Sequence, residues 1–340
     1  MQTVPGTKVS RELFRTPWWM ANPHLQTILP AFRRVVVPAR ARMTIGTPDG
    51  DFLDLDWLGD RGCGLVVLLH GLAGSSKSAY ILGLQKALVN AGFRTVAMNF
   101  RGCSGRPNNR ANVYHSGETG DIDQVVGCLR NKEPEIPVAA VGFSLGGNVL
   151  LKWLGEKAGK CDLFAAVSVS VPFQLDRCAD RMDRGVSRIY RNYLLSRLRR
   201  YMVEKLQHLE AGRLDEEAGR ITALGDLSGI RSFWDYDERV IAPLYGFNDA
   251  LDYYEQSSSR SFLASIRVPT LLLQSIDDPF MTPETVPTCE ELSSKVVLEA
   301  SSSGGHVGFV SGPVPGTQQY WLEQRIPEFL TAQLEQTVLG

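Results

Sequence analysis

A short serine motif between an apolar run and a helical run constrains the fold of this chain most strongly. The run VAAVGF at 138–143 leads into Gly142-Phe143-Ser144-Leu145-Gly146, and the helical pattern NVLLKWL follows. At a sharp strand-to-helix turn the serine backbone is strained, and only glycine leaves room at positions 142 and 146. Ordinary Gly-Ser turns share this pattern, but the strand before it and the helix after it favour a nucleophilic serine.

The surrounding sequence alternates strand-like and helix-like runs. Two early runs with alternating polarity, RMTIGTP and DFLDLDWL, are joined at Pro48-Asp49-Gly50 and predict a hairpin. The strand-like runs that follow are apolar throughout, which is typical of a parallel sheet covered on both faces. The sequence therefore predicts an α/β fold with a mostly parallel central sheet and helices on both faces. The later runs are LVVLL, YILGLQKALVNAG, TVAMNF, DIDQVVGCLRN, VAAVGF, AAVSVSV, TLLLQSI, VVLEA and a C-terminal helical run interrupted or kinked at Pro327.

The alternation stops between about Pro172 and Arg260, where a long Arg-rich helical segment replaces a short crossover. We expect an N-terminal arm and the first part of the core in residues 1–172, an inserted helical cap in 173–260, and the second part of the core in 261–340. A further helix within the cap is expected to have Asn248 or Asp249 as its N-cap.

One cap helix is predicted to be amphipathic, with basic residues crowding its other faces. We favour a helix that covers a pocket with its basic face in solvent, and the alternative is an interfacial helix that binds anionic lipid. The apolar positions recur at three- and four-residue spacing: Leu195, Leu198, Met202, Leu206 and Leu209.

Bulk composition excludes several classes of function. The chain has 36 Lys and Arg against 37 Asp and Glu, so no overall field attracts nucleic acid. Its six cysteines form no CxxC pair, which predicts neither a zinc site nor a disulfide framework. Reduced thiols and the lack of an apolar signal stretch in the first twenty residues favour a cytoplasmic protein. No cofactor or metal is expected, because nucleotide-binding glycine motifs and clustered metal ligands are lacking.

A serine nucleophile needs a base, and in a fold of this type the chain order is serine, acid, histidine. Of the five histidines, only His208 and His306 follow Ser144. His208 lies in the helical run LQHLEAG of the expected cap, whereas His306 follows the strand VVLEA in a glycine-rich loop. The sequence therefore predicts His306 as the general base.

Two adjacent carboxylates are candidates for the acid that orients this histidine. The strand TLLLQSI ends in Asp277-Asp278-Pro279. Neighbouring side chains in an extended segment point apart, so only one of the two faces the imidazole. We favour Asp278 because the turn to Pro279 begins there, and Asp277 is the alternative.

The apolar run that ends in His70-Gly71-Leu72 is where such a fold builds an oxyanion hole. The predicted donors are the backbone N–H groups of Leu72 and Leu145. The ring of His70 is expected to shape the loop rather than to react. We count His70 and Gly71 among the possible pocket residues.

The loop FRGCSGRPN follows the strand TVAMNF and falls at the same sheet edge. Arg101 and Cys103 are therefore further candidates for the pocket, and a tight glycine-rich turn is the alternative. Cys103 is a weaker nucleophile candidate than Ser144, because no base is placed beside it in the sequence.

These motifs resemble the YheT-like group of α/β hydrolases, the AB-hydrolase 4 family, which includes lipid-hydrolysing mammalian relatives. The resemblance implies the α/β-hydrolase fold and a triad of Ser144, Asp278 and His306. Membrane-anchored relatives carry an N-terminal hydrophobic span that this sequence lacks, so their location is not carried over. The matching stretches are NPHLQTILP at 22–30, HGLAGS at 70–75, NFRGCSG at 99–105, YHSGET at 114–119, GFSLGGN at 142–148, DDPF at 277–280 and GGHVGF at 304–309.

The expected function is a serine hydrolase that cleaves a carboxylic ester, as an esterase or acylglycerol-type lipase, through an acyl-Ser144 intermediate. The alternatives are an amidase or thioesterase with the same triad, and a non-catalytic member that binds a small molecule. The expected partner is a small-molecule ester, with lipid esters included. Nucleic acid is not expected, peripheral membrane contact is not favoured, and the sequence predicts no oligomeric state.

Overall fold

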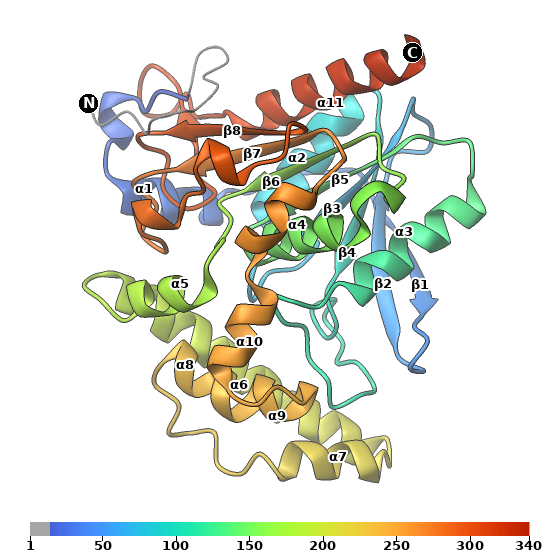
Figure 1. The fold of residues 1–340 in the computed structure, drawn as a ribbon, viewed down its shortest axis with the longest axis vertical. Coiled ribbons are helices and arrows are strands. Elements are labelled where there is room, and N and C mark those ends of the chain that lie inside the picture. The colour runs from blue at the N-terminus through green and yellow to red at the C-terminus, as the bar shows by residue number, and fades with distance from the viewer. Residues whose placement is uncertain (1–13, 340) are drawn as a thin grey trace.

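The computed structural model describes residues 14–339, so the predicted lack of a signal stretch falls largely on residues 1–13, outside the described part. The chain forms a central sheet, a two-stranded ribbon and helices in alternation with the strands (Figure 1). The strands are β1 Ala41–Gly46, β2 Phe52–Leu58, β3 Leu65–Leu69, β4 Arg94–Asn99, β5 Val138–Phe143, β6 Ala165–Val169, β7 Thr270–Ser275, β8 Val296–Ser301, β9 Val310–Ser311 and β10 Gln319–Tyr320. The helices are α1 Pro23–Ile28, α2 Ala79–Asn90, α3 Gly120–Lys132, α4 Leu145–Lys157, α5 Leu175–Met182, α6 Ser187–Ala211, α7 Asp215–Thr222, α8 Phe233–Tyr236, α9 Ala242–Tyr245, α10 Ala250–Ser257 and α11 Leu322–Leu339.

The central sheet has eight strands in the order β1-β2-β4-β3-β5-β6-β7-β8. The six strands from β4 to β8 are parallel, while β1 and β2 form an antiparallel hairpin and β2 pairs antiparallel with β4. The hairpin turns at the predicted residues, with Gly46 opposite Phe52. The mostly parallel sheet and the hairpin predicted from the sequence are both confirmed.

Helices cover both faces of the sheet, as the apolar strands predicted. Alternate residues of β3 enter two different cores: Val67 packs with residues of α3 and α4, and Val66 packs with residues of α2 and α11. Each residue of β3 is therefore buried against a helix layer rather than exposed to solvent. The helix α11 continues through Pro327, so no element boundary lies there.

Helices α5 to α10 come between β6 and β7 in the chain, and in Figure 1 they lie below the sheet. With Ala111 and Val113 they enclose a third apolar cluster, to which the residues of the predicted amphipathic stripe contribute. Four of the five stripe residues are buried there and Leu206 packs against the cluster, so the stripe is not available to a lipid surface. The helix α10 begins after Asp249, whose side chain accepts from the backbone N–H of Asp252.

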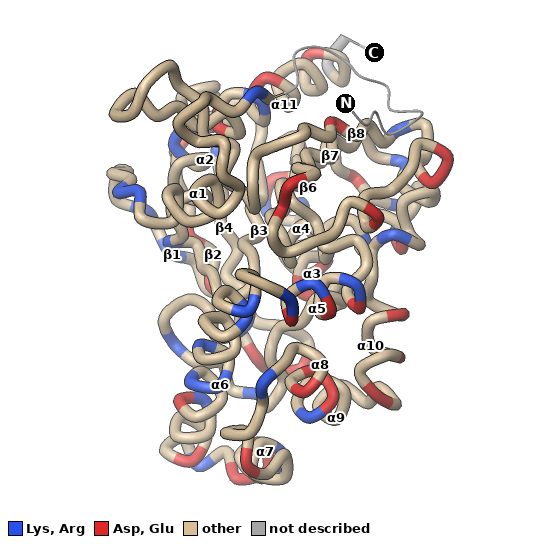
Figure 2. Tube along the Cα trace, turned by 90° about the vertical axis from the view of Figure 1, so that its left-hand side faces the viewer, with Lys and Arg blue, Asp and Glu red and all other residues tan. Residues whose placement is uncertain are grey.

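The face that carries α1, α5 and α6 has both signs of charge (Figure 2). Lys and Arg are interspersed with Asp and Glu along α5 and α6, whereas α1 has no charged side chain. Among residues 14–339, no helix combines the length and the apolar character needed to cross a bilayer.

Candidate active site

Three predicted site residues come together at one edge of the sheet. Ser144 follows β5, Asp278 follows β7 and His306 follows β8. These strands are parallel, so their carboxyl ends meet at the same edge. Residues 162 positions apart in the chain are therefore neighbours in space.

Ser144 occupies a strained turn. Its backbone has φ 51° and ψ −119°, a combination that few residues other than glycine adopt. A Cβ atom on Gly142 would lie 2.4 Å from the carbonyl oxygen of Gly146, and one on Gly146 would lie 2.6 Å from the carbonyl oxygen of His70. The glycines are therefore required by backbone contact, as the motif predicted, and the turn presents the Ser144 hydroxyl at the start of α4.

The side chains form a continuous chain of hydrogen bonds. The Ser144 Oγ lies 3.0 Å from Nε2 of His306, and Nδ1 of His306 lies 2.8 Å from Oδ2 of Asp278. His208 is remote from this chain, because α6 holds it 3.2 Å from Oδ1 of Asn109. The geometry is that of a nucleophile, a base and an orienting acid.

The two adjacent carboxylates point in different directions. Asp278 is buried, and its Oδ1 accepts the backbone N–H of Phe280 at 2.8 Å while Oδ2 faces His306. Asp277 accepts the backbone N–H of Gly305 at 2.9 Å and the hydroxyl of Ser275. Asp278 therefore contacts the imidazole, and Asp277 holds the loop that carries it.

Residues far away in the chain hold the His306 loop. The backbone N–H of His306 donates to Oγ1 of Thr27 at 3.0 Å, and that of Val307 donates to Oγ of Ser170 at 3.0 Å. The Phe280 ring stacks on the imidazole, with centroids 4.0 Å apart and planes 11° apart. Sequence reasoning assigned none of these contacts, although Thr27 lies in NPHLQTILP and Phe280 in DDPF.

Two predicted backbone donors are available at the nucleophile. The amide of Gly71 donates to the Tyr80 hydroxyl and that of Ala73 to the Tyr114 hydroxyl, each at 2.8 Å. Between them, the N–H of Leu72 has no hydrogen-bond partner among the described residues, and neither has that of Leu145, at the first position of α4. Both residues line the same cavity as Ser144. The two tyrosine hydroxyls, which sequence reasoning missed, fix the loop with the Leu72 amide free.

His70 is a structural residue of this loop. Its Nδ1 lies 2.8 Å from the carbonyl oxygen of Gly71, and its Nε2 accepts the backbone N–H of Phe100 at 3.2 Å. Burial lowers the pKa of this imidazole to about 4, so the ring is neutral at neutral pH. The ring does not line the cavity, whereas Gly71 does.

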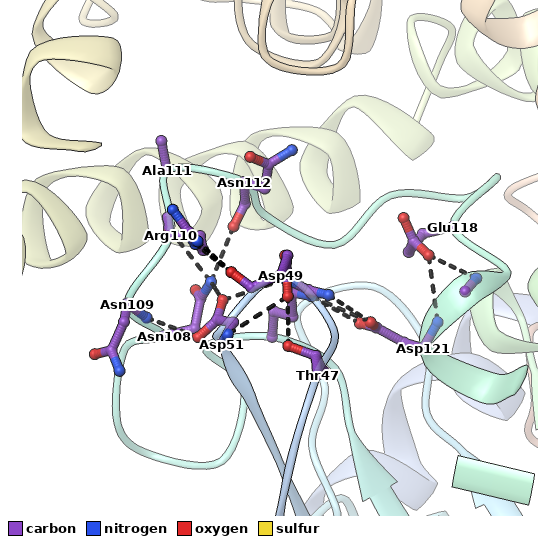
Figure 3. Close-up of polar contacts among 12 residues, drawn as sticks. Thr47, Asp49, Asp51, Asn108, Asn109, Arg110, Ala111, Asn112, Glu118 and Asp121 are labelled. Atoms are coloured by element: carbon purple, nitrogen blue, oxygen red, sulfur yellow. Dashed lines mark hydrogen bonds and ion pairs between the residues drawn. The ribbon is translucent and has the colours of Figure 1, made fainter. Parts of the chain in front are cut away.

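Arg101 does not line the cavity either, contrary to the sequence-based suggestion. Its guanidinium pairs with Asp49 and Asp51 of the β1–β2 turn and with Asp121 of α3. Figure 3 shows these three carboxylates close together. Burial opposes the charge of the guanidinium, but the hydrogen bonds that it donates to Asp121 and Asp49 raise its pKa far above the usual value. The loop position was predicted correctly, but the pairing with Asp49, Asp51 and Asp121 directs the side chain away from the site.

Cys103 faces a second hollow of about 280 Å³ rather than the cavity at Ser144. Burial raises the pKa of its thiol to about 12, which removes the thiolate needed for nucleophilic attack. All six cysteines lie in the described part of the chain and are unpaired. Within residues 14–339, no three His, Cys, Asp or Glu side chains are grouped to hold a metal ion.

A cavity of about 300 Å³ opens at Ser144 and runs between the sheet edge and the inserted helices. Its wall is mostly apolar. From the sheet side it includes Gly71, Leu72, Ser144, Leu145 and His306, and from the insertion it includes Leu175, Met182, Leu194, Leu198, Ile241 and several tyrosines. Such a cavity suits an apolar substrate whose reacting group lies at the serine.

Comparisons with known proteins agree with this geometry. Residues 64–313 match the model of the alpha/beta hydrolase fold family. The chain is 40% identical to the "Putative esterase YheT" of Escherichia coli K12, over 93% of this chain and 92% of that protein. It is 28% identical to mouse "Phospholipase ABHD3", over 96% of this chain and 80% of that protein.

A solved structure shares the fold at low sequence identity. The Pyrococcus furiosus esterase Pf2001 superposes with a TM-score of 0.55 at 18% identity, covering 88% of this chain and 98% of that one. At this identity the likeness concerns the fold alone. The family match and the 40% identity show the family as well as the fold: this chain belongs to the YheT-like α/β hydrolases.

Proposed function

We propose that this protein is a serine hydrolase that cleaves carboxylic esters through an acyl-Ser144 intermediate. The observation that carries the proposal is the hydrogen-bonded chain from Ser144 through His306 to Asp278, which opens on an apolar cavity. Relatives named as an esterase and as a phospholipase support the same class of reaction.

In the proposed mechanism, Ser144 Oγ attacks the ester carbonyl carbon while Nε2 of His306 takes its proton. The carbonyl oxygen becomes negative and accepts from the amides of Leu72 and Leu145, each such donor contributing roughly 3 kcal/mol. The tetrahedral intermediate collapses, and the departing alkoxide receives the proton held by His306. Water, deprotonated by the same imidazole, then attacks the acyl carbon and frees Ser144. Throughout, Asp278 stabilises the imidazolium and its tautomer.

The cavity favours an ester with an apolar part. Its wall from the inserted helices is built mainly of aliphatic and aromatic side chains, so an acyl chain or an apolar alcohol is stabilised there. We propose that residues 173–260 act as the cap that encloses this part of the substrate. An amide or thioester would react by the same steps, and a binding-only role would leave the aligned triad without a purpose.

We also propose a cytoplasmic location. The six unpaired cysteines support it, because disulfides are rare in that compartment.

Covalent labelling tests the nucleophile directly. A fluorophosphonate probe should label the wild-type protein, and Ser144→Ala should abolish both labelling and hydrolysis of p-nitrophenyl esters while thermal unfolding is unchanged. His306→Ala should remove nearly all turnover, whereas the matched control His208→Ala should retain most of it. Labelling that persists in Ser144→Ala would refute the assignment of the nucleophile. Esters of graded chain length, compared with the matching amides and thioesters, would separate the ester proposal from its alternatives.

A further inference from the structure

One acidic side chain interrupts the apolar wall that the inserted helices contribute to the cavity. Asp237 follows α8 and lines the cavity at Ser144 together with Tyr236, Tyr253 and Tyr254. It is the only Asp or Glu among the described residues of the cavity wall. Asp237 has no place in the triad, because the sheet edge supplies all of those residues.

The carboxyl group of Asp237 has one protein partner and one free oxygen. The Tyr254 hydroxyl donates to Oδ2 at 2.6 Å. No described residue donates to Oδ1. Because Oδ1 is also not one of the inaccessible polar atoms without a partner, it is accessible from outside the protein interior. Part of the Asp237 surface is accessible although the cap shields the residue from bulk solvent. We therefore place Oδ1 at the cavity surface.

A carboxyl group in such surroundings is unfavourable unless a ligand compensates it. Removing a carboxylate from water without full hydrogen bonding destabilises the charged form strongly. Burial raises the pKa of Asp237 to about 7, in spite of the hydrogen bond from Tyr254. An apolar side chain would fill the same place without this penalty, so the carboxyl group points to a role in binding.

The backbone at Asp237 is also irregular. Residues 237–241 form a π-helical turn between α8 and α9. Turns of this kind occur mostly within α-helices and are frequently found at functional sites. Here the turn begins at the one residue that brings a carboxyl group to the cavity wall.

We propose that Asp237 determines specificity by accepting a hydrogen bond from a free hydroxyl group of the substrate, which is therefore a hydroxyl-bearing ester. This inference rests on the proposed function, since it names the class of ester that the same cavity selects. Oδ1 accepts a hydrogen bond from the hydroxyl group, while the hydrogen bond from Tyr254 holds Oδ2 in place. The rest of the ester lies against apolar side chains, and its carbonyl carbon reaches Ser144.

A neutral hydroxyl fits this wall better than a cationic group. An ammonium ion would lose its hydration in a cavity where Asp237 is the sole carboxylate among the described lining residues. A hydroxyl group loses less on desolvation, and it can donate to the carboxylate or accept from its protonated form. The nearby tyrosine rings can attract a cation, so the experiment includes a cationic substrate.

The test compares matched esters on one enzyme preparation. Pairs of equal length differ only in a methyl or a hydroxyl group, placed at the end of the acyl chain in one pair and on the alcohol part in the other. A third acyl ester ends in an ammonium group. The readout is the ratio of kcat/KM between members of a pair, measured for wild type, Asp237→Leu and the control Asp235→Asn. Asp235 lies in α8, two positions before Asp237, but is exposed and does not line the cavity.

The wild type should prefer the hydroxyl member of at least one pair, and Asp237→Leu should lower that preference roughly 10- to 100-fold. Asp235→Asn should keep the wild-type ratio. If Asp237→Leu does not fold, Asp237→Asn serves instead and should lower the preference several-fold, because a neutral acceptor binds a hydroxyl more weakly.

An unchanged ratio in a folded Asp237 variant, a wild-type preference for the methyl esters in both pairs, or a preference for the ammonium ester would each overturn the inference. Turnover of the methyl esters tests the proposed function separately. If the wild type hydrolysed none of the esters and resisted the fluorophosphonate probe, the proposed function would fail, and this inference with it.

Discussion

The substitution Asp278→Asn is the sharpest test of the orienting acid, because the contacts of both carboxylate oxygens are known. The Asn Oδ1 can still accept the backbone N–H of Phe280, now 2.8 Å from the carboxylate, so the loop is retained. The other atom, 2.8 Å from Nδ1 of His306, becomes an NH₂ donor. Two donors then face each other unless the imidazole moves its proton to Nε2. In that tautomer Nε2 carries a hydrogen toward Ser144 and cannot take its proton.

The expected loss is large. An acid-to-amide change of this kind in a serine protease triad lowers kcat by about 10⁴, which corresponds to about 5.5 kcal/mol of transition-state stabilisation. The burial and direct contact of Asp278 favour an effect of that order here. KM should change little, because Asp278 does not line the cavity.

The neighbouring carboxylate provides the matched control. Asp277→Asn keeps an acceptor for the N–H of Gly305, and its side chain does not touch the imidazole. It should therefore lose less than about tenfold in kcat, in line with one weakened hydrogen bond. Both variants are assayed on one activated ester, with thermal unfolding as the check on folding. A larger loss for Asp277→Asn would reverse the assignment, and small losses for both would refute the triad as described.

Two further changes test the support of the site, and a third tests the buried Lys205 of α6. Gly146→Ala should lower the free energy of unfolding by roughly 1 to 3 kcal/mol and reduce kcat, since the new methyl group meets backbone oxygen at 2.6 Å; wild-type melting and kcat would contradict this. Thr27→Val should reduce kcat about tenfold, because the N–H of His306 loses its acceptor, while the Ser144 label is kept; unchanged kcat would show that the contact is dispensable. Burial lowers the pKa of Lys205 to about 7 from 10.5, so the unfolded state binds more protons between these values. Its contribution to stability should therefore rise with pH in this window, by up to about 1.4 kcal/mol per unit, and denaturant titrations of Lys205→Met should show a shallower rise than wild type.

The sequence predicted the parts of the fold that follow local rules. Apolar runs of strand length predicted the parallel strands, and the Pro48-Asp49-Gly50 turn predicted the hairpin. The residues that the order rule selected lie in hydrogen-bond contact, because strand ends in a parallel sheet converge whatever the length of the chain between them. The opposite directions of neighbouring side chains predicted that only one of the adjacent acids faces the imidazole, and the turn that begins before Pro279 favoured Asp278.

Other parts of the site depend on contacts that no local pattern carries. Thr27 precedes His306 by 279 residues, and the Tyr80 and Tyr114 hydroxyls reach the Leu72 loop from separate segments. Arg101 is a residue that the sequence placed in the pocket and that distant contacts direct away from it. Its position at the sheet edge was predictable, but three carboxylates from other segments decide where the guanidinium points.

The cavity wall shows why the hydrolase class can be predicted from sequence motifs, whereas the substrate cannot. The sheet edge positions Ser144, and its strained turn depends on backbone contacts with neighbouring strands. The inserted helices pack in an apolar cluster separate from the two cores of the sheet, so their residues can change with little effect on the strands that lead to Ser144, Asp278 and His306. Asp237 belongs to this second part, and nothing in its local sequence separates it from the exposed Asp235 two positions earlier. Only the packing of α8 and α10 brings it to the cavity with Tyr254, so the role in specificity proposed for Asp237 follows from the structure and not from a local pattern.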